Sequence, residues 1–129
     1  MKNKFIAIYL VTLLFIWFSA SYAKRALPQE VKPIMHKGIE YRAPHDYMGC
    51  IEAWDIKSKE IIWRKQVYVI KHVIGVERDV QDVFIKSMHL SLSGNSLVII
   101  NEKGFEYKLD LKSLEVKAIK GSLAVEFKR

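Results

Sequence analysis

Residues 49–61, GCIEAWDIKSKEI, recur 55 residues further along the chain as residues 104–116, GFEYKLDLKSLEV. Glycine, aspartate, lysine, serine and glutamate stand at equivalent positions in the two copies. Each copy consists of a glycine, a strand-like run, a polar turn and the start of a second run, which is the pattern of a β-hairpin. The repeat therefore predicts two related hairpin units.

The turn residues of each copy have a local structural role. Asp55 with Ser58, and Asp110 with Ser113, are placed to accept hydrogen bonds from turn amides. The glycine that opens each copy allows a tight turn before the hairpin. The residues of the repeat explain a hairpin structure, and they do not indicate a catalytic function.

The first copy resembles one blade of the pyrroloquinoline-quinone-type β-propeller repeat, over the fifteen residues 49–63. Ala53, Asp55 and Trp63 match the Ala-x-Asp, turn and closing Trp of that repeat. The turn glycine of the repeat is replaced in this chain, by Lys59 in the first copy.

The second copy departs further from the repeat, with Lys108, Leu114 and Ala118 at the Ala, turn Gly and Trp positions. A propeller has at least about four blades of four strands, and this chain has room for about two. The resemblance implies a blade-like meander, and it carries over no cofactor site.

Outside the repeat, β-branched and aromatic runs bounded by turn residues predict an all-β fold of about eight antiparallel strands. We expect two blade-like meander halves, packed as a small sandwich or a partly open barrel. The expected strands are residues 39–43, 50–56, 61–73, 83–92, 97–101, 105–111, 116–119 and 123–127.

The domain organisation follows from the same pattern. Residues 24–38 contain two prolines and predict an extended lead-in, and residues 39–129 form a single β-domain. Within it, units of about 39–74 and 83–127 are joined by the polar segment 75–82, which has the spacing of one helical turn.

Alternation along the strands predicts which side chains are buried. In the second copy the apolar residues at odd positions 105–111 alternate with polar residues, so they form the core face. By equivalence, the even positions 50–56 face the core in the first copy. Because Ile51 and Ala53 are also apolar, we expect that strand to be covered on both faces, with Trp54 and Trp63 inside.

The first 23 residues predict an export signal. A basic start is followed by an apolar run, residues 5–18, and then by Ser21 and Ala23 in the small-x-small pattern of a cleavage site. The alternative is a retained anchor, but 14 apolar residues fall short of the roughly 20 that span a bilayer. We expect a periplasmic or extracellular protein with no transmembrane span after cleavage.

Charge narrows the class of partner. Removal of residues 1–23 takes away Lys2 and Lys4 and lowers the formal net charge from +7 to +5. We expect this positive charge to favour solubility or to attract an anionic glycan or lipid surface. An envelope protein is the other expected partner. The basic residues are not clustered as in a nucleic-acid-binding stripe, so we expect no nucleic acid.

The sequence holds no constellation with the spacing of a catalytic, metal or cofactor site. The four histidines are scattered, and the lone Cys50 lies in a strand with no flanking His or Arg to activate it, so we expect a structural thiol. Glycine-rich phosphate loops and a Gly-x-Ser-x-Gly elbow are absent. We therefore expect no enzyme, no metal and no cofactor.

The candidate binding surface consists of Glu52, Tyr47, His72 and His89. Glu52 is the carboxylate that replaces an aromatic residue of the second copy, and a half-buried acid pairs with a base, here Arg42 or Arg64. The favoured function is a non-enzymatic binding or accessory protein of the cell envelope. The alternatives are a small hydrolase or lyase that joins Glu52 to one of these histidines, and a structural subunit of a larger envelope assembly.

Overall fold

The computed structural model describes residues 26–127, so the expected export signal lies outside the described residues. The fold is all-β, as expected from the sequence. Two four-stranded antiparallel sheets and one two-stranded parallel sheet contain the ten strands of this region.

The first sheet has the order β1-β2-β3-β4. Its strands are β1 (Ile34–His36), β2 (Ile39–Arg42), β3 (Cys50–Asp55) and β4 (Ile61–Gln66). Strand β1 lies in the segment that we expected to be an extended lead-in. Its side-chain pattern is too short to predict a strand, and its pairing with β2 makes it one.

The second sheet is a meander with the order β6-β7-β8-β9. Its strands are β6 (Ile85–Leu90), β7 (Ser96–Asn101), β8 (Glu106–Asp110) and β9 (Val116–Lys120). All four lie where the sequence predicts strands.

The expected strand over 61–73 is wrong, because the chain leaves the first sheet after β4. Strand β5 (Val69–Lys71) pairs in parallel with β10 (Ala124–Glu126), so this pair also departs from the expected antiparallel arrangement. The break follows from Gly49, whose carbonyl oxygen accepts hydrogen bonds from the amides of Val67 and Tyr68 at 2.7 and 3.4 Å. The β5–β10 pair then joins the end of one unit to the end of the other.

The connection between the units contains the short helix α2 (Arg78–Gln81), where one helical turn was expected. The buried Gln81 side chain donates to the carbonyl oxygens of Val73 and Val76 at 3.2 and 3.0 Å. Its Oε1 atom accepts from the amide of Val73 at 2.5 Å. The Gln81 side chain thus satisfies backbone groups of the connection that have no partner in a sheet.

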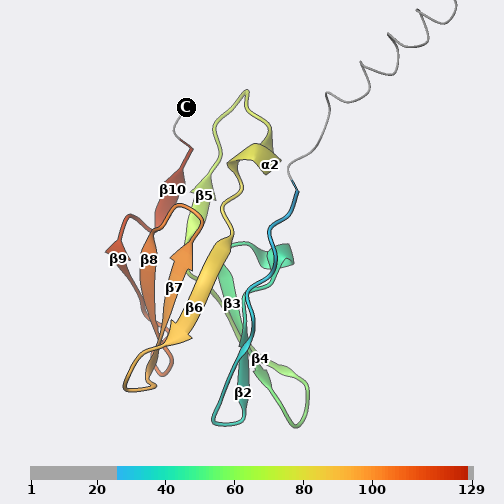
Figure 1. Cartoon of the computed structure of the whole chain (residues 1–129), viewed down its shortest axis with the longest axis vertical. Helices are drawn as coiled ribbons and strands as arrows, with labels where there is room; N and C mark the ends of the chain where they lie inside the picture. The colour runs from blue at the N-terminus through green and yellow to red at the C-terminus, as the bar shows by residue number, and fades with distance from the viewer. Residues whose placement is uncertain (1–25, 128–129) are drawn as a thin grey trace, which may run out of the picture.

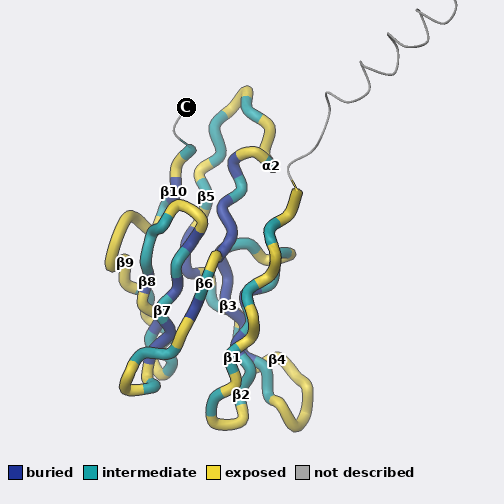
Figure 2. The backbone as a smooth tube through the Cα atoms, viewed as in Figure 1, coloured by how far each residue is buried: buried dark blue, intermediate teal, exposed yellow. Residues whose placement is uncertain are grey.

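The two four-stranded sheets pack as a small sandwich, and the β1–β2, β3–β4, β6–β7 and β8–β9 hairpins turn at the same end, which we call the hairpin end (Figure 1). Buried residues follow the space between the sheets, whereas the hairpin tips are exposed (Figure 2). At the centre, the rings of Tyr68 and Tyr107 stack with their centroids 5.2 Å apart. The core cluster consists of Tyr41, Ala43, Ile51, Ala53, Val67, Tyr68, Val83, Ile85, Met88, Leu97, Ile99, Tyr107, Leu109 and Val125.

The two copies of the repeat place opposite faces in this core. Tyr107 and Leu109 are fully buried in the second unit, as expected, but in the first unit the core residues are Ile51 and Ala53. The expected equivalence of the core faces is therefore wrong. The two units stack in the same orientation, so one face of the first sheet packs against the opposite face of the second sheet, front to back. The core residues Ile51 and Ala53 of the first copy are therefore not the equivalents of the core residues Tyr107 and Leu109 of the second.

The other face of β3 is also covered, because Cys50 and Glu52 are 6% and 5% exposed. Trp54 and Trp63 are both half-buried. Trp63 stands opposite the buried Ala53 and packs against the core cluster, as expected, whereas Trp54 lies on the other face of the sheet, under Arg42, and is not a core residue. Trp63 packs beside Tyr41, with ring centroids 6.0 Å apart. Of the two tryptophans, Trp54 is therefore the one that lies on the outer face of the first sheet.

Candidate functional site

Glu52 and Tyr47, two of the expected site residues, are joined by Arg64. Glu52 on β3 stands directly opposite Arg64 on β4. The Nε and Nη2 atoms of Arg64 donate to Glu52 Oε2 at 2.9 and 2.5 Å. The guanidinium lies over the ring of Tyr47, 3.5 Å from its centroid. Of the two arginines expected beside Glu52, Arg64 is the one that forms the ion pair.

Arg42 forms a second arrangement of the same kind on the same face. Its Nε atom donates to Glu40 Oε1 at 2.7 Å, and its guanidinium lies 4.6 Å from the ring centroid of Trp54. Each arginine therefore lies between a carboxylate and an aromatic ring. The hydrogen bond that each arginine donates to its carboxylate raises the pKa of that arginine. Each arginine is paired with a carboxylate, so these residues have little unpaired charge with which to bind a ligand.

The N-terminal segment contributes to the burial of Glu52. Residues 29–33 and the start of the β2–β3 connection border a hollow of about 480 Å³ next to Arg42 and Glu52. Glu30 accepts a hydrogen bond from the amide of His45, at 3.1 Å. This contact ties the segment to the short 3₁₀ helix η2 (His45–Tyr47).

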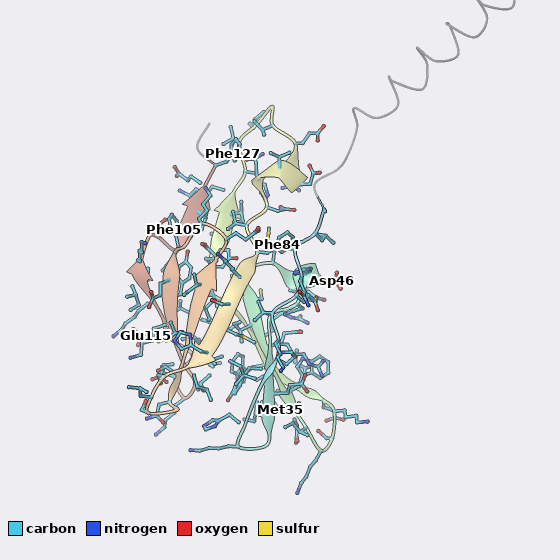
Figure 3. The ribbon with its side chains drawn as sticks, viewed as in Figure 1. Met35, Asp46, Phe84, Phe105, Glu115 and Phe127 are labelled. Atoms are coloured by element: carbon cyan, nitrogen blue, oxygen red, sulfur yellow. The ribbon has the colours of Figure 1, made fainter. Side chains whose placement is uncertain are left out.

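Helix η2 lies against the start of the second unit. Figure 3 shows Asp46, on η2, near Phe84, which precedes β6. The ring of His45 packs on Phe84, with centroids 4.7 Å apart. Tyr47, which is 48% exposed, therefore lies on a short helix that contacts the second unit at Phe84.

The two histidines of the expected surface lie elsewhere. His72 Nε2 is 3.6 Å from Asp82 Oδ1, near α2, and His89 is exposed on β6. Among residues 26–127, no hydrogen bond or ion pair joins either histidine to Glu52. The structure brings two of the four expected residues together and separates the other two from them.

Cys50 has the environment of a structural thiol. Its Sγ atom lies 3.2 Å from Gln66 Oε1, and burial raises its pKa. A raised pKa lowers the fraction of reactive thiolate. The arrangement favours packing over nucleophilic chemistry.

The outer face of the second sheet carries the expected site residue His89 together with lysines that the sequence did not indicate. The strand registers place His89 opposite Val98, Val98 opposite Lys108, and Lys108 opposite Lys117. Both lysines and the histidine are exposed. The available signal was the repeat itself, since Lys108 occupies the position of the buried Ala53.

A second row runs beside the first. It places Ser87 opposite Ile100, Ile100 opposite Glu106, and Glu106 opposite Lys120. We call the two rows together the lysine face. Its one acidic side chain, Glu106, stands opposite Lys120, and no ion pair within the described part of the chain involves Lys108 or Lys117.

Within residues 26–127, no group of three or more His, Cys, Asp or Glu side chains is arranged to hold a metal ion. The same residues contain no helix that is long and apolar enough to cross a membrane. The sequence matches no model of a known protein family, and a search of curated proteins finds no match. The fold and surfaces define the class: a small all-β protein of two stacked four-stranded sheets.

Proposed function

We propose that this chain is an exported, non-enzymatic binding protein of the cell envelope, and that its lysine face attaches to an anionic lipid surface. The amino-terminal sequence pattern supports export. The observation that carries the attachment is Lys108 directly opposite Lys117 on an exposed sheet face, with no carboxylate paired to either.

Two like charges directly opposite each other destabilise a sheet. An arrangement that disfavours folding, on a face that solvent reaches, supports a role in binding. An anionic surface would neutralise both ammonium groups at once. It would also contact Lys120 and the imidazole of His89.

The composition of the face favours lipid over a protein partner. Protein interfaces are enriched in aromatic residues and depleted in lysine. Neither row of the lysine face contains Trp, Tyr or Phe, and the centre is formed by the half-buried side chains of Val98 and Ile100. A basic patch near an anionic membrane gains about 1 kcal/mol per lysine. Three lysines therefore support weak, salt-sensitive attachment.

Vesicle co-sedimentation tests the proposal. The full chain should bind vesicles that contain phosphatidylglycerol and should not bind vesicles of phosphatidylcholine alone. Salt well above the physiological level should release the protein, because it screens exposed charges. The double variant Lys108→Gln/Lys117→Gln should bind about tenfold or more weakly, which matches the loss of two lysine contacts.

The matched control is Lys57→Gln/Lys59→Gln, which removes two exposed lysines from the β3–β4 turn. Its vesicle affinity should stay within about twofold of the parent protein. Equal loss in the two double variants would reject the lysine face. A soluble phosphorylated glycan that binds this face, with no vesicle binding, would reject lipid as the partner.

A further inference from the structure

A cleft of about 1000 Å³ lies between the two units at the hairpin end of the molecule. The β1–β2 hairpin borders it on one side, and the turns after β6 and β8 border it on the other. Figure 3 labels Met35 and Glu115 on the two sides of this end. No residue of the lysine face lines the cleft, and neither do Glu52, Arg64 and Tyr47.

His36 on β1 gives the first indication of a ligand. Its Nε2 atom is buried and has no hydrogen-bond partner among the described residues. His45 and Trp54 also have buried ring nitrogens without a hydrogen-bond partner among the described residues, but neither residue lines this cleft. A buried polar atom without a partner costs about 1–3 kcal/mol. Gly94, in the turn after β6, lies against this atom, so a ligand in the cleft would supply the missing partner by displacing that turn.

Charge at the cleft favours an anion. Lys37 and Lys112 line it from opposite units, and both are exposed. The one carboxylate among the lining residues is that of Asp110, whose Oδ1 accepts hydrogen bonds from the amides of Lys112 and Ser113 at 2.9 and 2.8 Å. These bonds lower the pKa of Asp110, so its carboxylate stays charged, and Lys112 also interacts with it electrostatically. The two ammonium groups outnumber this one carboxylate, so the cleft keeps a net positive charge.

The other residues that line the cleft include both polar and apolar side chains. Tyr41 and Asn95 contribute a hydroxyl and an amide, while Ile39 and Leu111 contribute apolar walls. Small-molecule sites have this mixture and a volume of about 300–1,000 Å³.

We propose that this cleft binds a small anionic sugar, a hydroxylated ring that carries a carboxylate or a phosphate. A sugar hydroxyl both donates and accepts, so it can pair with His36 Nε2 in either tautomer of the imidazole. The anionic group lies between Lys37 and Lys112. The proposal does not depend on the lysine face, which lies on the other side of the second sheet.

An NMR titration of the full chain tests the cleft with three probes: glucuronate, glucose 6-phosphate and glucose. We expect saturable shifts at His36, Tyr41 and Asn95, and an affinity for at least one anion about tenfold above that for glucose. The two anions separate carboxylate from phosphate as the recognised group. Shifts confined to other residues, or equal affinity for glucose and both anions, would overturn the proposal.

Two variants separate the two kinds of contact. His36→Phe keeps an aromatic ring but removes the nitrogen, and it should weaken all three probes by about tenfold. Lys37→Gln/Lys112→Gln should abolish the preference for the anions. Lys57→Gln/Lys59→Gln, at the same end of the molecule, should leave that preference unchanged.

The lysine variants decide the question even where His36→Phe fails to fold, because both lysines are exposed. An anion preference retained in Lys37→Gln/Lys112→Gln would reject the site. Vesicle binding by the same variant should match that of the parent protein. A failure of the cleft is thus distinguishable from a failure of the lysine face.

Discussion

Lys59 and Leu114 occupy equivalent places in the two hairpin turns and have positive φ, 58° and 61°. The turns match in their backbone bonds as well: the amide of Lys59 donates to Asp55 O, and that of Leu114 to Asp110 O, each at 2.9 Å. In the propeller repeat that the first copy resembles, glycine holds this position. A side chain in the left-handed region costs about 1–2 kcal/mol.

Lys59→Gly should therefore stabilise the protein by about 0.5 kcal/mol, since relief of the left-handed strain exceeds the added freedom of the unfolded chain. Lys59 is exposed, so the substitution loses no buried contact. Urea denaturation gives the free energy of unfolding. The matched control is Lys57→Gly, in the same turn but without positive φ, which should destabilise by about 0.5–1 kcal/mol. Equal effects of the two substitutions would show that the turn holds no such strain.

At the scale of the elements, Arg64 compensates the burial of Glu52 between β3 and β4. Glu52 is 5% exposed, and two hydrogen bonds from Arg64 reach one of its oxygens. Arg64→Ala leaves that carboxylate buried without its partner, and we expect a loss of about 1–3 kcal/mol in the free energy of unfolding. Arg42→Ala removes a comparable side chain from a more exposed pair and should cost about 0–1 kcal/mol.

A second substitution tests the cause of that loss. Glu52→Gln in the Arg64→Ala background replaces the unpaired charge with a neutral amide, which is less costly to bury. The double variant should be more stable than Arg64→Ala alone in the same denaturation experiment. A double variant less stable than Arg64→Ala would place the loss in packing against Tyr47.

The strands that the sequence predicts correctly are those with local signals. Hairpins β3–β4 and β8–β9 follow from alternation and from the Asp-x-Lys-Ser turn, which lies within each hairpin. The break between β4 and β5 has no such signal, because it depends on a contact between Gly49 and Tyr68. A Cβ at position 49 would stand 2.5 Å from Tyr68 O. The parallel β5–β10 pair joins residues too distant in sequence for any local pattern to specify.

At the scale of the whole molecule, the two units stack front to back, and this explains why the candidate site was only partly predicted. Equivalent positions of the repeat have different surroundings: Ala53 is fully buried, whereas Lys108 is exposed. Glu52 and its pairing with an arginine followed from neighbouring strands of a single unit. The lysine face and the cleft depend on which face each unit turns outward, and two copies of a hairpin do not specify that choice.

A pair of substitutions tests the stacking directly. Ala53→Lys gives the first unit the residue that the second has at the equivalent position, and it places an ammonium group at a position with 0% exposure. Because burial of an unpaired charge is strongly unfavourable, we expect a loss of at least about 3 kcal/mol and an unfolded or aggregated protein at physiological temperature. Lys108→Ala is the reciprocal change on an exposed face, and its free energy of unfolding should stay within about 0.5 kcal/mol of the parent value. Circular dichroism under urea measures both. If equivalent faces of the two units met in the core, position 53 would lie on the outer face of the first sheet, where a charged side chain can pair as Glu52 does with Arg64. Ala53→Lys would then be tolerated, so a stable Ala53→Lys variant would contradict front-to-back stacking.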